Sequence, residues 1–154
     1  MDKILDDPSI PINNKIKTML NFKMYMEICE TLARNAASKG NSAVGSLLLS
    51  NNKVIAKAEE AVHSNQDVSC HAEMEVIRKA RKILGRDMSG TVLVTNKEPC
   101  VMCSYAIRYH KISKVVYKEH ASSLGGINSQ FNLLTTDAVP PEWGSPTICI
   151  ELDF

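Results

Sequence analysis

Two cysteines, Cys100 and Cys103, stand three residues apart directly after Pro99. Proline is favoured at the start of a helix, so a helix is predicted to begin here, with both sulfurs on one of its faces. The positive end of the helix dipole and the free backbone N–H groups lower thiol pKa values and favour thiolates, which bind zinc. The Cys-x-x-Cys spacing alone is also typical of thioredoxin-like redox pairs, so metal, redox and plain core roles all stand open here.

A histidine supplies a third candidate ligand. His71 begins another predicted helix 29 residues before Cys100, and a predicted strand lies between the two. Two helices that start on the same side of a sheet can bring three ligands to one point. One histidine and two cysteines leave the fourth tetrahedral position of zinc for water, as in catalytic sites. A closed structural site would need a fourth protein ligand, for which the sequence offers His63 and Cys70.

The carboxylate of Glu73 stands two residues after His71, where it can reach a zinc-bound water without binding the metal. Zinc lowers the pKa of that water toward about 7, which provides hydroxide at neutral pH. One reaction that such a hydroxide can perform is hydrolytic deamination, the replacement of an amino group on a ring. It also needs a group that takes the proton and delivers it to a ring nitrogen and to the leaving amine. We therefore predict one zinc ion per chain at His71, Cys100 and Cys103, with Glu73 as the catalytic group.

The elements that must position these residues follow from hydrophobic periodicity and turn signals. Helices are predicted over 14–39, with a break near Asn21, over 70–84 and from 99 to about 110. Strands are predicted over 43–50, 54–56, 91–95, 114–117 and 147–150. Residues 1–14 are interpreted as an irregular lead-in, 59–69 as a loop and 131–134 as a helical turn. A hairpin followed by alternating strands and helices predicts a mixed sheet with helices on both faces.

The bulk composition is that of one ordinary globular domain. A chain of 154 residues, with 44% hydrophobic and 23% charged residues, fits a single core. We assign 1–154 to one deaminase domain, with 1–22 as an N-terminal extension. The acidic N-terminus lacks the pattern of a signal peptide, and five cysteines without secretory context argue against disulfides. A cytoplasmic protein is expected, and no apolar run approaches the ~20 residues that span a membrane.

The charge of the chain does not demand a nucleic-acid partner. The formal net charge is +1, whereas proteins that bind nucleic acid through its phosphates usually carry an excess of basic residues. One run is locally basic and falls within a predicted helix: Arg78, Lys79, Arg81, Lys82 and Arg86. We interpret it as a solvated helix face rather than an RNA-binding stripe.

At these residues the sequence resembles the cytidine deaminase superfamily, whose signature is H-x-E followed by P-C-x-x-C. The resemblance covers roughly residues 25–117, and its strongest stretch runs from 98–103 through 106–107 to 115–117. That stretch is most similar to the branch of guanine deaminases, fungal-type cytosine deaminases and tRNA wobble-adenosine deaminases. The resemblance implies an α/β fold, a three-layer α/β/α sandwich around a five-stranded mixed sheet, usually assembled as a homodimer.

The resemblance also implies roles for single residues. His71, Cys100 and Cys103 would bind zinc, and Glu73 would shuttle protons. The backbone N–H of Ala72, at a helix start, would bind the substrate ring.

Three departures from the branch concern the substrate. Where the branch has a ring-binding asparagine, eleven residues before the zinc histidine, this chain has Glu60. An ionised carboxylate only accepts hydrogen bonds, so Glu60 in the pocket would favour a ring with N–H donors, whereas a realigned loop would leave it solvated. Guanine deaminases of the branch often place an acid after the fourth strand, which Glu119 matches only uncertainly. The tail ends in residues 151–154, which are acidic, whereas tRNA deaminases of this type tend to end in a basic helix.

The leading hypothesis is thus an enzyme that releases ammonia from an amino-substituted nucleobase, nucleoside or related heterocycle, in nucleobase metabolism and without a membrane partner. The alternative is a tRNA-specific adenosine deaminase acting on a flipped-out base. A basic surface beside the pocket, with Arg78, Lys79 and Arg108, would support it. The third hypothesis is a zinc ion that only stabilises the fold.

Overall fold

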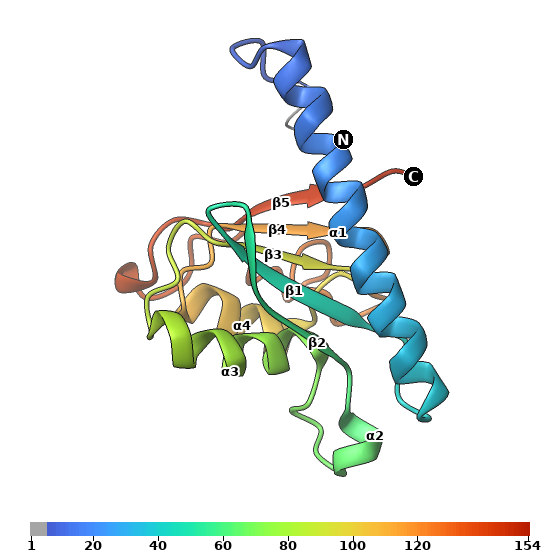
Figure 1. Ribbon diagram of the computed structural model, residues 1–154. Helices are drawn as coiled ribbons and strands as arrows, with labels where there is room; N and C mark the ends of the chain where they lie inside the picture. The colour runs from blue at the N-terminus through green and yellow to red at the C-terminus, as the bar shows by residue number, and fades with distance from the viewer. Residues whose placement is uncertain (1–5) are drawn as a thin grey trace.

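The structure, a computed structural model, describes residues 6–154 (Figure 1). Its centre is one five-stranded sheet with the order β2-β1-β3-β4-β5. The strands are β1 (Gly45–Ser50), β2 (Lys53–Glu59), β3 (Val92–Thr95), β4 (Lys114–Tyr117) and β5 (Ile148–Glu151). The first two pairings, β2 with β1 and β1 with β3, are antiparallel, and the other two are parallel. The predicted mixed sheet is confirmed.

The hairpin that opens the sheet turns at Asn51 and Asn52. Both residues have positive φ, 49° and 60°, as a two-residue turn of the type that matches strand twist requires. Asparagine tolerates this conformation better than most other side chains. The turn pairs Ser50 with Lys53, and the register then shifts between Leu48 and Leu49. Because β1 lies between β2 and β3 and is antiparallel to both, β2 and β3 run in the same direction.

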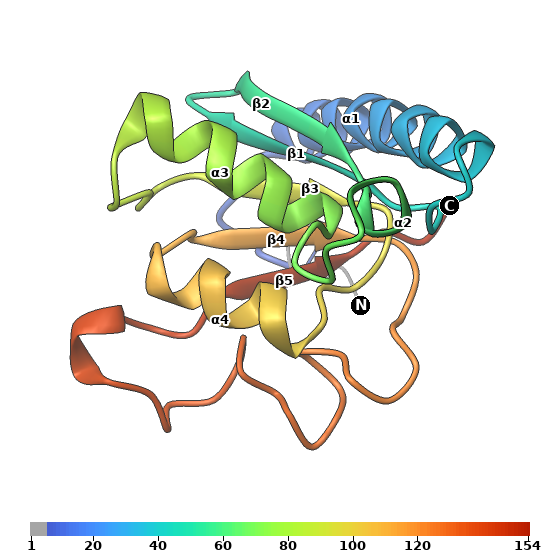
Figure 2. The same cartoon turned by 90° about the horizontal axis from the view of Figure 1, so that it is seen from below.

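Helices cover both faces of the sheet, so the predicted three-layer sandwich is confirmed (Figures 1 and 2). α1 (Ile12–Ser38) packs on one face, where Leu47, Val94 and Val116 point. α3 (Ala72–Leu84) and α4 (Val101–Tyr109) pack on the other. That face carries alternate residues of the same strands, including Leu48, Leu93 and Val115. The alternation follows from the two-residue period of a strand.

The N-terminal region differs from the prediction. α1 is one continuous helix from Ile12 to Ser38, so the break near Asn21 is wrong, as is an irregular chain over 12–14. Phe22 and Met26, just after Asn21, are buried against the sheet, and their packing outweighs the small helix cost of asparagine. The first part of α1 projects beyond the sheet (Figure 1). Residues 1–5 of the predicted lead-in lie outside the described residues.

The segment between β4 and β5 is mostly irregular, and one buried arginine organises it. The Arg108 guanidinium donates hydrogen bonds to the carbonyl oxygens of Leu133 (2.9 Å), Thr136 (2.8 Å) and Gly144 (3.3 Å). Residues 131–134 form hydrogen-bonded turns, not a helix. Two short elements were not predicted, α2 (Val62–Asn65) in the loop 59–69 and the 3-10 helix η1 (Pro141–Trp143). Within residues 6–154, no helix is both long and apolar enough to cross a membrane.

Candidate active site

Two helix starts meet at one edge of the sheet. β2 and β3 run in the same direction, so the connections that leave their carboxyl ends begin at the same edge. The connection after β2 leads to α3, which His71 precedes as its N-cap, and that after β3 leads to α4, which Cys100 precedes as its N-cap. Both cap residues have extended backbone conformations, as N-caps do. The sheet therefore brings together residues that are 29 positions apart in the sequence.

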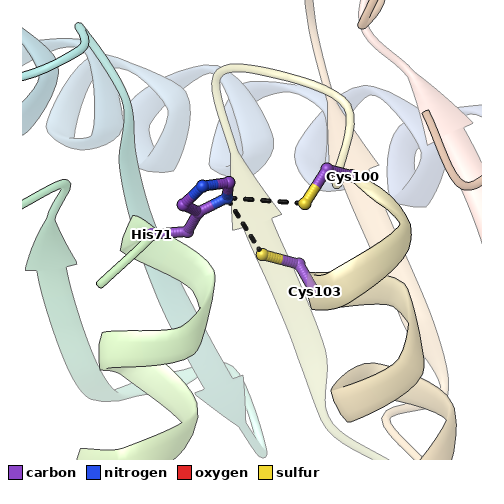
Figure 3. Close-up of side chains that lie close together, drawn as sticks. All are labelled: His71, Cys100 and Cys103. Carbon is purple, nitrogen blue, oxygen red and sulfur yellow. Dashed lines mark hydrogen bonds between the residues drawn. The ribbon is translucent and has the colours of Figure 1, made fainter. Parts of the chain in front are cut away.

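The three predicted ligand side chains point at one another (Figure 3). The Nδ1 atom of His71 lies 3.4 Å from the Cys100 sulfur and 3.6 Å from the Cys103 sulfur. A tetrahedral zinc ion, with bonds of 2.0–2.1 Å to nitrogen and 2.3 Å to sulfur, separates such donors by about 3.5 Å. The spacing and the soft donor set both fit zinc.

The fourth coordination position is not filled by a protein side chain of the described part of the chain. His71, Cys100 and Cys103 form the metal-donor group found there, with donor atoms all within 4.8 Å of one another. Neither candidate for a closed site belongs to it. Cys70 is buried and accepts a hydrogen bond from the Asn65 side chain, 3.5 Å away, and His63 is exposed on α2. The arrangement is that of an open, catalytic zinc site.

The two thiols differ in acidity. Hydrogen bonds from Cys103 and His71 lower the pKa of Cys100 to about 4, so this sulfur is a thiolate at neutral pH. The hydrogen bond that Cys103 makes to that thiolate, together with its burial, raises the pKa of Cys103 well above its usual value.

Glu73 lies behind the ligand cluster and is almost completely buried, with 3% of its surface exposed. One carboxyl oxygen accepts a hydrogen bond from the Thr95 hydroxyl at 3.2 Å, and the other accepts one from the Cys103 thiol at 3.6 Å. Burial raises the pKa of this carboxyl above its ordinary value. A carboxyl group with a raised pKa beside the metal ligands is suited to both accepting and donating a proton.

A cavity of about 230 Å³ opens onto this cluster. Ala72 lines it at the first turn of α3, where backbone N–H groups have no partner within the helix. The other lining residues, besides Glu73 and two of the zinc ligands, are Ser42, Val44, Glu60, Lys97, Glu98, Ala121, Ser122, Ser123 and Leu124. The space can hold one heterocyclic ring next to the ligand cluster.

Glu60 lies in the wall of this cavity and is buried, with 4% exposed, rather than solvated. Its two carboxylate oxygens accept hydrogen bonds from the backbone N–H groups of Ser42 (2.8 Å) and Val62 (2.9 Å). A carboxylate has about four lone-pair sites, so these bonds leave acceptor capacity on both oxygens.

The role of one buried residue, Glu98, was not predicted from the sequence. Glu98 is 3% exposed and accepts hydrogen bonds from the backbone N–H groups of Ala121 (2.9 Å), Ile127 (3.0 Å) and Asn128 (3.2 Å). It thus holds the loop that forms one wall of the cavity. A Cβ atom at Gly125 would lie 2.3 Å from the Glu98 carboxylate, so this position requires glycine. The paired glycines 125–126 were the available signal.

Other candidate pocket residues lie elsewhere. Glu119 does not line the cavity, and neither does His63. Arg108 is buried under the irregular segment, so it forms no surface beside the pocket.

Comparison with known proteins decides the family. Residues 19–119 match the model of the cytidine and deoxycytidylate deaminase zinc-binding region. The chain belongs to this family. It is 33% identical to a tRNA-specific adenosine deaminase of Aquifex aeolicus over 71% of this chain and 74% of that protein. It is 31% identical to a guanine deaminase of Bacillus subtilis over 68% of this chain and 69% of that one.

Solved structures agree with the sequence relatives. A structure from studies of tRNA:A34 deaminases matches with a TM-score of 0.76 and 26% identity, over 84% of this chain and 97% of that chain. The guanine deaminase of Bacillus subtilis matches with a TM-score of 0.61 and 30% identity, over 64% of each chain.

Membership in this deaminase family confirms the predicted chemistry. The chain is a zinc-dependent hydrolytic deaminase. His71, Cys100 and Cys103 would hold the zinc ion, which would supply the Lewis acidity for activating water near neutral pH. The Glu73 carboxyl group adjoins the Cys103 sulfur and is the group predicted to carry the proton transfers.

Proposed function

We propose that this deaminase acts on a small amino-substituted ring, as a free base, a nucleoside or a related heterocycle. The observation that carries the proposal is the charge at the cavity, because Lys97 is the only lysine or arginine of residues 6–154 that lines it. An RNA substrate presents several phosphates around a flipped-out base, and useful affinity needs several cationic contacts. One lysine does not provide them.

The basic residues of α3 do not change this picture. Arg78 forms an ion pair with Glu75, and Lys79 donates a hydrogen bond to the Lys57 carbonyl oxygen. Arg81 and Lys82 stand in the last turn of α3, whereas the cavity adjoins its first turn. At 1.5 Å per residue this helix is about 20 Å long. These residues form a solvated face away from the site.

The ring is proposed to lie between the Ala72 backbone and Glu60. The N–H of Ala72 donates to a ring acceptor, and Glu73 delivers its proton to the ring nitrogen. Glu60 accepts from ring N–H groups through the acceptor capacity that its bonds to Ser42 and Val62 leave over. The preferred ring therefore carries N–H donors on the edge away from the reacting carbon.

Exchange of the Glu60 carboxylate for an amide tests this assignment. Glu60→Asn offers N–H groups as well as an acceptor, so we expect the catalytic efficiency for donor-edged rings to fall about tenfold or more. The catalytic efficiency for rings whose edge carries acceptors should rise relative to that for donor-edged rings. The measurement is kcat/KM on adenine-, cytosine- and guanine-type rings for both proteins. An unchanged order of preference would show that Glu60 only anchors the residues 42 and 62.

A tRNA adenosine deaminase is the second candidate, and the relatives favour it. Similar curated proteins include tRNA-specific adenosine deaminases of Aquifex aeolicus and Bacillus subtilis, both 33% identical to this chain. The structure from studies of tRNA:A34 deaminases is covered over 97% of its length. The single lysine that lines the cavity within residues 6–154 argues the other way.

Ammonia release from a substrate panel tests the proposed function. The panel holds cytosine, adenine, guanine, their nucleosides, amino-pterins, amino-triazines and a tRNA anticodon stem-loop. We expect turnover of a small ring, reduced 10²–10⁴-fold in Glu73→Gln because proton transfer is lost. Metal analysis serves as the control, since Glu73→Gln retains all three zinc ligands and should keep one zinc per chain. Turnover of the stem-loop alone would overturn the proposal and establish the second candidate.

We also propose that the chain is one domain, with residues 1–22 as an extension, and that it works as a cytoplasmic homodimer. Free cysteines support a reducing compartment, because residues 6–154 contain no disulfide. Exposed apolar side chains on the outer surfaces of α3 and α4, Ile83 (64%) and Tyr105 (54%), support self-association. Light scattering should give twice the chain mass of 17.0 kDa, whereas a monomer mass at micromolar concentration would contradict the dimer.

A further inference from the structure

We propose that Lys97, with the hydroxyl groups of Ser122 and Ser123, binds an anionic group carried by the substrate, a phosphate or a carboxylate. The inference rests on the proposed function, because it names the class of small ring that this pocket accepts. All three residues line the cavity that contains the zinc ligands. The group they would hold is a substituent of the ring rather than the ring itself, since Glu73 and Ala72 line the part that adjoins the metal site.

The backbone around Lys97 is fixed on both sides. Asn96 is buried, and its side chain accepts a hydrogen bond from the Gly45 N–H (2.9 Å) and donates one to the Ala43 carbonyl oxygen (3.0 Å). Glu98 is buried on the other side, and its N–H donates to the Glu119 carbonyl oxygen at 2.7 Å. Because both neighbours point into the protein, the intervening Lys97 side chain is exposed, and it lines the cavity.

The Lys97 ammonium group has no salt-bridge or hydrogen-bond partner in the part of the chain that the structure describes. Glu119 is one possible competitor for it, since the two residues form a parallel β-bridge. Their side chains nevertheless form no ion pair within residues 6–154. A lysine that lines an active-site cavity without a carboxylate partner is available to a ligand anion.

The loop that carries the two serines is equally well held. Glu98 accepts the N–H of Ala121 at 2.9 Å, and the Leu124 carbonyl oxygen accepts the N–H of Val101 at 2.8 Å. Ser122 and Ser123 lie between these two anchor points and are both exposed. Glu98 thus adjoins Lys97 in sequence and also fixes the loop that carries the serines. One buried carboxylate positions both halves of the proposed site.

The chemistry of these groups suits one oxoanion. An ammonium group supplies charge-assisted hydrogen bonds, and hydroxyl groups add neutral ones. The carboxylates that share the cavity wall compete weakly for the ammonium, because Glu98 and Glu60 are buried and already accept backbone N–H bonds. A single lysine matches a single anionic substituent, and it does not match the row of phosphates on an RNA strand.

Calorimetric binding to the zinc-loaded Glu73→Gln protein, which does not consume the ligand, tests the inference. The ligands are guanosine, adenosine and cytidine, their 5′-monophosphates, and an aminopyrimidine with and without a carboxylate. We expect at least one anionic ligand to bind about tenfold more tightly than its neutral counterpart, with a difference that shrinks at high salt. A preference confined to the phosphate ligands, or to the carboxylate ligand, would identify which of the two anionic groups the site binds.

Two further variants in the same background decide whether Lys97 is responsible. Lys97→Met keeps the length of the side chain and should abolish the preference, whereas Glu119→Gln is the matched control and should leave it intact. Equal binding of anionic and neutral ligands, no binding of any ligand, or a preference that survives in Lys97→Met would each overturn the inference. Lys97-dependent binding of an anticodon stem-loop without binding of any mononucleotide would also overturn it, in favour of RNA.

The failure of this inference is distinct from failure of the proposed function. Ammonia release from an uncharged ring without any anion preference would leave the proposed function standing and reject the role of Lys97. Tight, Lys97-dependent binding of an anionic ring that is never deaminated would support the role of Lys97 and reject the proposed function.

Discussion

The meeting of two helix starts at one sheet edge is the constraint on which the rest of the site depends. β2 and β3 are parallel to each other because β1 lies between them and is antiparallel to both. Only that order places the N-caps of α3 and α4 at the same edge, with His71 Nδ1 within 3.6 Å of both sulfurs. Helix starts also favour thiolates and present free N–H groups to a ligand. The sheet order thus brings the three metal donors and the start of α3 to one place.

The three buried carboxylates of this site differ in the hydrogen-bond donors around them. Glu73 is buried with few hydrogen-bond donors around it, which raises the pKa of its carboxyl and lets it exchange protons. Glu98 is just as buried, yet three backbone N–H groups satisfy it, so it serves as a fixed anchor for the pocket wall. Glu60 lies between these cases, with two backbone donors and acceptor capacity left over. The kind of donor separates the roles more than burial does, because Glu73 has a hydroxyl and a thiol, whereas Glu60 and Glu98 have backbone N–H groups.

Much of this arrangement could be predicted from the sequence, because the residues involved have few alternatives. His71, Cys100 and Cys103 are rare residue types at helix starts, and the hydrophobic period marked all five strands. Non-local packing could not be predicted. The continuity of α1 past Asn21 depends on Phe22 and Met26 reaching the sheet, and the burial of Arg108 depends on carbonyl groups 25–36 residues further along the chain. Lys97 became informative only when its neighbours were seen to point inward.

X-ray absorption at the zinc edge of the loaded protein tests the central claim, an open three-ligand zinc site. The account predicts two sulfur donors at about 2.3 Å, from Cys100 and Cys103, and two lighter donors at about 2.0 Å, of which His71 supplies only one. The second lighter donor should be replaced when a competitive ring ligand is added. Three sulfur donors, which would bring in Cys70, or two histidines with no exchangeable position, would show a closed structural site and contradict the account.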